Sequence, residues 1–224
     1  IEGGGTKFVC VVAGGPVEIF SETRFSTTTP AETLGRVVDF FTSEAALGPL
    51  ESIGFASFGP ADLDLTSPTY GHVTGTPKPG WSWTDVVGPI QTALGIPVAF
   101  ETDVNAAALG EFTWGAGQGV DPLIYFTIGT GIGAGVIVNG APLHGLVHPE
   151  TGHIHLPHDR NDDPFSGRCP FHGDCFEGLA SGPAMQDRWG VRAETLPPDH
   201  PAWELEAGYI ATALVDQIYS LSPR

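Results

Sequence analysis

Apolar and polar positions along the chain alternate between the two-residue period of strands and the 3.6-residue period of helices. Residues 1–13 predict a strand, a glycine turn and a second strand, and short apolar runs bounded by turn residues predict further strands at residues 17–26, 53–58, 97–101, 123–128 and 134–138. Helical spacing predicts helices at residues 30–47, 83–94, 106–114, 176–189 and 202–221. Strands that alternate with helices in this way predict an α/β architecture.

Composition narrows the class of protein. The 224 residues carry a net charge of −17, so no basic stripe is available to neutralise nucleic-acid phosphates or to bind an anionic membrane. No apolar run approaches the roughly 18 residues of a membrane helix, and no signal peptide is visible. Three Cys do not make a disulfide framework. We therefore expect a cytoplasmic protein that binds neither nucleic acid nor membrane.

Two glycine-rich turns lie between predicted strands, one in each half of the chain. The first contains Gly4, Gly5, Thr6 and Lys7. Glycine lets backbone N–H groups approach a phosphate closely, and Thr and Lys add a hydroxyl and a cation. A plain β-hairpin is the alternative for this turn taken alone.

The second turn reads G-T-G-I-G-A-G from residue 129 and includes Thr130 and Gly131. A dinucleotide-binding fold would place such a glycine run before a helix, but a strand follows here, which counts against NAD. Two such turns indicate a duplicated α/β unit that grips one polyphosphate from both sides.

A carboxylate at the end of a predicted strand is the candidate general base. Asp103 follows the strand at residues 97–101 and leads into a helix, and Asn105 lies two residues further on. A carboxylate in this position can accept a proton from a hydroxyl that attacks a phosphoryl group. The alternative is a helix N-cap Asp.

A metal site is predicted between residues 144 and 182, which hold six of the eight His and two of the three Cys. Cys169, His172 and Cys175 form C-x-x-H-x-x-C, and thiolate with imidazole suits zinc. The sequence alone does not decide which upstream histidine is the fourth ligand, and the candidates are His144, His148, His153, His155 and His158. Glu150 and Glu177 in the same stretch are either partners for sugar hydroxyls or solvated charges.

Taken in order, these motifs resemble the ROK (repressor, open reading frame, kinase) sugar kinases, and within them the bacterial fructokinases. The resemblance extends over nearly the whole chain and is carried by E-G-G-G-T-K-F, S-F-G-P, T-D-V-N-A-A-A-L-G-E, T-I-G-T-G-I-G-A-G, H-P-E-T-G-H and C-P-F-H-G-D-C-F-E-G-L-A-S-G-P-A. It implies an actin-like ATPase (ribonuclease H-like) fold of two α/β domains, which we expect at residues 1–115 and 116–224. The second domain is expected to be truncated at its C-terminus.

The resemblance also implies an activity: transfer of the γ-phosphoryl group of ATP to fructose, with Mg²⁺, giving fructose 6-phosphate. Asp103 would be the general base. Sugar hydroxyls would be held by Asn105, Glu150, His153 and Glu177, and phosphates by Gly4, Gly5, Thr6, Lys7, Thr130 and Gly131. Zn²⁺ would be held by His153, Cys169, His172 and Cys175, which leaves the other upstream histidines as non-ligands.

Three departures from the wider family favour its fructokinase branch. Glu2 stands where many members have Asp near Mg²⁺, Thr102 stands where glucokinases have Asn, and His172 stands in a loop that is usually richer in Cys. The alternatives are a broader hexose kinase acting on mannose or glucose, or a non-catalytic sugar-binding or regulatory member. The resemblance further suggests a homodimer.

Overall fold

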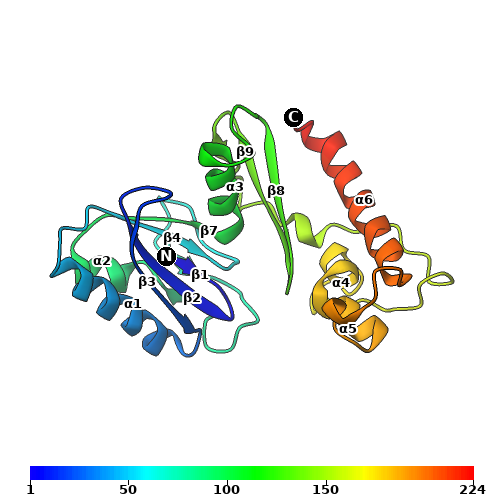
Figure 1. Cartoon of the computed structure of the whole chain (residues 1–224), viewed down its shortest axis with the longest axis horizontal. Coiled ribbons are helices and arrows are strands. Elements are labelled where there is room, and N and C mark those ends of the chain that lie inside the picture. The colour runs from blue at the N-terminus through cyan, green and yellow to red at the C-terminus, as the bar shows by residue number, and fades with distance from the viewer. The chain divides into compact units, whose positions relative to one another are not determined.

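The computed structural model describes all residues, 1–224, and they form two compact units (Figure 1). The first unit contains Ile1–Ala107 and His144–His148, and the second contains Ala108–Leu143 and Pro149–Arg224. The chain therefore passes between the units three times, whereas the sequence suggested one junction after residue 115. The predicted domain boundary at residue 115 stays a prediction.

A five-stranded sheet with the order β3-β2-β1-β4-β7 forms the centre of the first unit. Its strands are β1 (Glu2–Gly3), β2 (Lys7–Ala13), β3 (Ile19–Ser26), β4 (Ile53–Ser57) and β7 (Val98–Thr102). The β1-β2-β3 part is antiparallel, whereas β1, β4 and β7 run parallel to one another. Because parallel strands end at the same edge, the residues that follow β4 and β7 come close together.

Two helices, α1 (Pro30–Ala45) and α2 (Gly88–Leu94), pack beside each other against this sheet (Figure 1). Thr29 caps α1 by accepting a hydrogen bond from the Glu32 N–H. The core between helices and sheet is apolar, and its largest fully buried side chains include Phe8, Phe55 and Trp81.

The helix predicted at residues 83–94 begins later than expected. Trp83 has a positive φ of 60°, and β6 (Thr84–Asp85) pairs with β5 (His72–Val73). The Asp85 carboxylate accepts hydrogen bonds from the N–H groups of Val87 and Gly88, so the helix begins there. The prediction for residues 83–87 was wrong because an aspartate in a turn was taken for a helical position.

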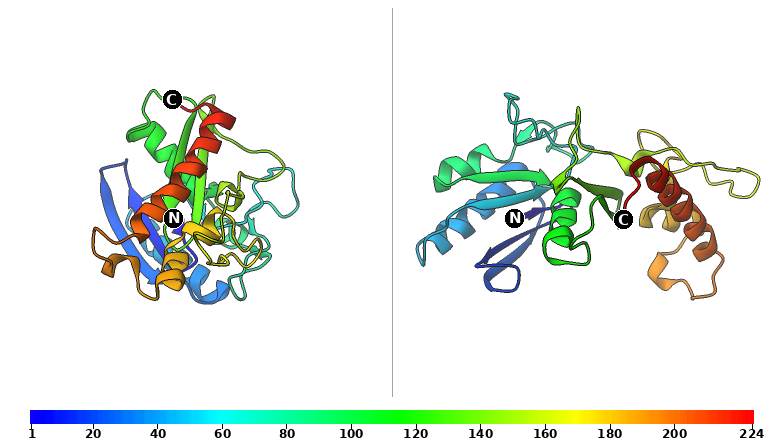
Figure 2. Two further views of the ribbon diagram at one scale, coloured as in Figure 1. Left: turned by 90° about the vertical axis from the view of Figure 1, so that its right-hand side faces the viewer. Right: turned by 90° about the horizontal axis from the view of Figure 1, so that it is seen from above.

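A three-stranded antiparallel sheet with the order β10-β9-β8 belongs to the second unit. Its strands are β8 (Leu123–Ile128), β9 (Ile132–Val138) and β10 (Ala141–Pro142), and Figure 2 shows the long β8–β9 hairpin from two sides. Asn139 and Gly140 both have positive φ, as the turn after β9 requires. One edge of β8 pairs with no strand.

The remaining helices are α3 (Asp103–Trp114), α4 (Phe176–Ala180), α5 (Gly182–Trp189) and α6 (Ala202–Leu221), with 3₁₀ turns η1 (Thr151–His153) and η2 (Ala193–Thr195). The single helix predicted at residues 176–189 is broken at Ser181, whose hydroxyl caps α5 by accepting from the Ala184 N–H. Pro183 in the first turn of α5 fits this start.

A groove of about 580 Å³ lies between β8 and the end of α6. Its lining is largely apolar and includes Leu123, Tyr125, Leu214 and Ile218. No helix combines the length and the hydrophobicity that crossing a lipid bilayer requires.

Candidate active site and metal centre

Asp103 is the first residue of α3, directly after the strand β7. The helix cap is Thr102 instead, because its hydroxyl oxygen accepts from the Asn105 N–H at 3.2 Å. Thr102 is therefore the N-cap of α3, and the alternative that Asp103 serves only as the N-cap is wrong. One Asp103 oxygen, Oδ1, accepts from the Val104 N–H at 2.9 Å.

The pKa of the Asp103 carboxyl lies above its ordinary value. Burial is the main cause, and the negative charge of Glu2 adds to it. The Val104 N–H and the charge of His148 act in the opposite direction. A partly buried carboxylate with a raised pKa is a stronger base than an exposed one, as proton abstraction from a hydroxyl requires.

Asn105 lies fully buried in the first turn of α3. Its amide Nδ2 donates to Glu101 Oε1 at 2.9 Å, while its Oδ1 accepts no hydrogen bond. Glu101 Oε2 in turn contacts His144 Nε2 at 2.8 Å. A buried acceptor without a partner needs a donor such as a hydroxyl or water, which fits the predicted sugar contact.

Two residues of this cluster were not expected near Asp103: Glu101 was not singled out from the sequence, and His148 was considered only as a metal ligand. His148 is buried, and its Nε2 accepts from the Ala61 N–H at 3.5 Å, across 87 positions of sequence. It lies close enough to Asp103 to influence that residue's pKa. Nothing in the local pattern around His148 indicates such a distant partner, so the sequence offered only the general richness in histidine.

The first glycine-rich turn joins β1 to β2. The Gly4 N–H donates to the Lys7 carbonyl at 2.9 Å, and the Thr27 hydroxyl donates to the Gly4 carbonyl at 2.7 Å. Thr6 and Lys7 are exposed, and Gly5 has no atom near the place of a Cβ. The turn therefore presents open backbone and a cation, as a phosphate-binding turn needs.

The second glycine-rich turn joins β8 to β9 and is closed by the Gly129 N–H, which donates to the Gly131 carbonyl at 2.9 Å. Thr130 is exposed at its tip. Glu177, predicted as a sugar ligand, contacts this turn: its Oε2 accepts from the Ile132 N–H at 3.0 Å. The predicted sugar contact stays a prediction, and a carboxylate has lone pairs for both roles.

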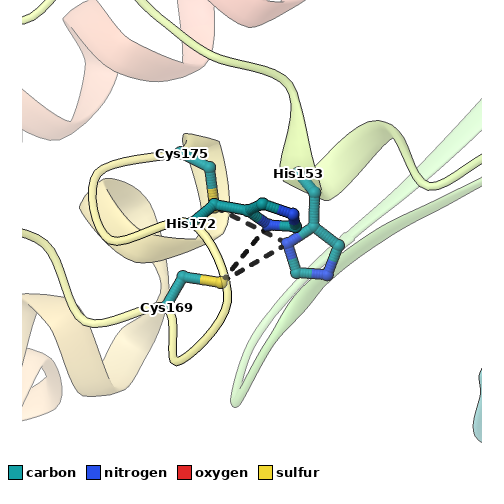
Figure 3. A group of neighbouring side chains, drawn as sticks. All are labelled: His153, Cys169, His172 and Cys175. Atoms are coloured by element: carbon teal, nitrogen blue, oxygen red, sulfur yellow. Dashed lines mark hydrogen bonds between the residues drawn. The ribbon is translucent and has the colours of Figure 1, made fainter. Parts of the chain in front are cut away.

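Four side chains gather at the predicted metal site, all in the second unit (Figure 3). The Nδ1 atom of His153 lies 3.7 Å from Cys169 Sγ and 3.6 Å from Cys175 Sγ, and His172 Nδ1 lies 3.7 Å from Cys169 Sγ. All four ligand atoms lie within 4.8 Å of one another. The structure thus brings together the four predicted ligands, and the ring of His155 lies beside them, 6.2 Å from the ring of His172.

These spacings suit a tetrahedral zinc ion. With Zn–S of about 2.3 Å and Zn–N of about 2.0 Å, tetrahedral geometry places sulfur and nitrogen about 3.5 Å apart. Both cysteines are buried, and burial together with Cys169 raises the pKa of the Cys175 thiol to about 11. A cation bound by these two buried thiols would deprotonate them.

The surrounding backbone holds the four predicted ligands in place. Cys169 and Gly173 exchange two backbone hydrogen bonds of 2.9 and 3.0 Å, which form a tight hairpin around His172. The Phe176 N–H donates to the Ile154 carbonyl at 2.9 Å, so Cys175 lies next to the strand-like segment that follows His153. In Figure 3 the second ring nitrogen of His153 faces away from the sulfurs.

Glu150 is exposed, and it precedes η1. Its carbonyl accepts from the His153 N–H at 2.9 Å, so it helps to set the backbone of that ligand. Its predicted contact with a sugar hydroxyl stays a prediction.

A buried ionic network around Asp163 anchors the long loop between His153 and Cys169. Asp163 Oδ2 accepts from the Tyr209 hydroxyl at 2.7 Å, and Oδ1 accepts from Arg188 Nε at 3.2 Å. His158 contacts the Asp163 carbonyl at 2.9 Å and the Asp174 carboxylate at 3.1 Å. The loop is therefore tied to α5 and α6, a link that the sequence did not indicate.

Comparison with known proteins gives the same family throughout the chain. A model of the ROK family matches residues 1–223. A fructokinase of Zymomonas mobilis is 48% identical over 218 residues, which cover 94% of this chain and 71% of that protein. A fructokinase of Lactococcus lactis is 44% identical over 223 residues, which cover 100% of this chain and 74% of that protein.

Solved structures agree on the fold. A ROK hexokinase from Thermus thermophilus superposes with a TM-score of 0.76 at 26% identity, over 99% of this chain and 77% of that one. A ROK glucokinase from Streptomyces griseus superposes with a TM-score of 0.77 at 24% identity, over 99% and 79%. The chain thus belongs to the ROK family and has the actin-like ATPase fold of its sugar kinases.

Proposed function

We propose that this chain is a fructokinase, which transfers the γ-phosphoryl group of ATP to a hydroxyl of fructose and forms fructose 6-phosphate. The observation that carries the chemistry is the pair at the start of α3: Asp103 with its raised pKa, and Asn105 with a buried oxygen that lacks a donor. Fructokinases at 44–48% identity over nearly the whole chain support the choice of sugar.

In this mechanism Asp103 accepts the proton of the attacking hydroxyl. The hydroxyl oxygen bonds to the γ-phosphorus as the bond from that phosphorus to the β–γ bridging oxygen breaks, and ADP leaves. The Asn105 oxygen accepts a hydrogen bond from a sugar hydroxyl and fixes the distance to the base. Catalysis is then mainly positioning and electrostatic stabilisation.

The glycine-rich turns supply the proposed phosphate contacts. In the first unit these are Gly4, Gly5, Thr6 and Lys7, and in the second they are Thr130 and Gly131. Glu2 lies close enough to Asp103 to raise its pKa, and we propose that it helps to hold Mg²⁺. When bound with ATP, that ion would neutralise phosphate charge.

In the second unit, Glu150, His153 and Glu177 are the proposed partners of sugar hydroxyls. We propose that Zn²⁺ on Cys169, His172, Cys175 and His153 Nδ1 fixes the ring of His153, so that its other nitrogen is presented to the sugar. The metal then has a bracing role and supplies no chemistry to the transfer.

Steady-state kinetics with ATP and a panel of fructose, mannose and glucose tests the proposal. We expect the highest kcat/KM with fructose. Equal rates with all three sugars would make the protein a general hexokinase, and sugar binding without ADP release would make it a binding module.

The residue assignment needs its own variant. Asp103→Asn keeps the size of the side chain and removes the base, so we expect kcat to fall by about 10²–10⁴-fold with unchanged circular dichroism. Retained turnover would exclude Asp103 as the base. We also propose a homodimer, which light scattering measures directly.

A further inference from the structure

We propose that the metal loop, residues 169–175, and the second glycine-rich turn, residues 129–132, are structurally coupled. Glu177 is the positioning residue that joins them. Glu177 follows the ligand Cys175 by two residues and lies in the first turn of α4. Its carboxylate accepts from the Ile132 N–H at 3.0 Å, across 45 positions of sequence. Ile132 is the first residue of β9 and ends the turn.

A second contact holds the other end of the turn. The Gly182 N–H donates to the Gly129 carbonyl at 2.8 Å. Gly182 opens α5, immediately after the short α4. Residues 177–182 therefore contact both ends of the turn, at Gly129 and at Ile132.

A third contact comes from the other side of the metal site. Gly152 precedes the ligand His153, and a Cβ atom at Gly152 would overlap the Ile132 carbonyl oxygen. A Cβ at Gly131 would come within 2.7 Å of Glu177 Oε2. The backbone of η1 and the Glu177 carboxylate thus lie directly against the turn, with no room for a side chain between them.

These contacts couple metal binding to the conformation of the second glycine-rich turn. A glycine-rich turn has many accessible conformations unless other groups restrain it. Here the restraints come from residues next to two metal ligands, Cys175 and His153. An ion that fixes both ligands therefore also narrows the conformations of the turn, and coupling between two sites is reciprocal.

Only the identity of the group that binds to the turn, a nucleotide phosphate, rests on the proposed function. The coupling between the metal loop and the turn, called the tie below, rests on the contacts of Glu177, Gly182 and Gly152. Metal loss is then expected to weaken nucleotide binding as well as sugar binding.

Hydrogen–deuterium exchange of the zinc-loaded and chelator-stripped chain tests the tie without catalysis. We expect zinc removal to speed exchange of the amides at residues 129–132, by roughly tenfold at Ile132, because the Glu177 carboxylate is then held less firmly against the Ile132 N–H. Glu177→Ala should do the same with zinc still bound. Glu204→Ala, an exposed glutamate on α6, is the matched control and should change nothing there.

A conservative variant separates positioning from general destabilisation. The amide oxygen of Glu177→Gln can still accept from the Ile132 N–H, so slow exchange at Ile132 should be restored in this variant with zinc bound. Glu177→Ala should raise the KM for ATP by roughly tenfold.

Faster exchange at residues 169–175 on zinc removal, with residues 129–132 unchanged, would overturn the proposal. If the chain bound no Zn²⁺, the metal brace of the proposed function would fail, while the comparison of Glu177→Ala with Glu177→Gln would still decide the tie.

Discussion

Asn105 shows how a single atom can indicate a ligand. Its Oδ1 is buried and accepts no hydrogen bond, while its amide nitrogen is held by Glu101. Buried polar atoms without partners are rare in folded proteins, so this atom indicates a place where a hydroxyl group or water would donate a hydrogen bond. The orientation of Asn105 is set before any sugar arrives, because Glu101 is itself held by His144.

At the same scale, the charges near Asp103 should set the acid limb of the pH profile. Its carboxyl must be ionised to accept a proton, and its pKa is raised, so kcat/KM should fall at a higher pH than for an ordinary aspartate. Glu2→Gln removes a charge that raises this pKa, and His148→Gln removes one that lowers it. We expect the limb to move to lower pH in the first variant and to higher pH in the second.

Profiles of kcat/KM for the sugar, measured at saturating ATP, check this. Shifts in the same direction in both variants would show that the limb belongs to another group.

At the scale of elements, the metal loop should depend on its cysteines. Cys175→Ser removes one of four ligands, so we expect zinc affinity to fall by at least about tenfold and the KM for fructose to rise. Cys10→Ala is the matched control: Cys10 is a buried thiol in the sheet of the first unit, and its pKa is raised to about 11 by burial.

Elemental analysis together with sugar kinetics provides the measurement. The control should keep one zinc per chain, and an unchanged zinc content in Cys175→Ser would remove that residue from the ligand set.

Helix α6 carries a buried acid that should make stability depend on pH. Burial raises the pKa of Glu206 to about 7, although the charge of Arg188 opposes this, and its Oε2 has no hydrogen-bond partner. As pH rises from about 4.5 towards 7, the unfolded chain releases this proton while the folded chain keeps it, so stability falls through that window.

Glu206→Gln cannot ionise and should abolish this loss. We expect it to be more stable than wild type by about 1–2 kcal/mol at pH 8 and nearly equal at pH 5. Denaturant unfolding at the two pH values measures this, with the exposed Glu204→Gln as control. An equal effect at both pH values would assign the change to packing instead.

For the molecule as a whole, hydrophobic periodicity was sufficient to predict the bounds of an element wherever one apolar pattern continued without interruption. The bounds of α6 and β8 agree with the prediction, because each has one long apolar pattern and no competing cap. Helix starts failed where a side chain bonds the backbone, as at Asp85 and Ser181, since such local bonds override periodicity.

The cluster of two Cys and two His could be predicted because three of its members lie within seven residues, and the resemblance supplied His153. The roles of His148 and Glu101 could not, because their partners are brought together only by the edge of the parallel strands. The Asp163 network was missed for the same reason, since its members come from a loop and two helices.

The return of His144–His148 into the first unit limits how this protein can be divided. A fragment that ends at Ala107 lacks the His144 partner of Glu101 and the His148 partner of the Ala61 N–H. The chain passes between the two units three times, so a protease cut at any one of these places leaves two peptide connections between the units intact. Chimeras with related kinases should therefore exchange residues 108–143 and 149–224 together and keep residues 144–148 with the first unit. A simple head-to-tail exchange would combine His144 and His148 from one parent with β7 from the other.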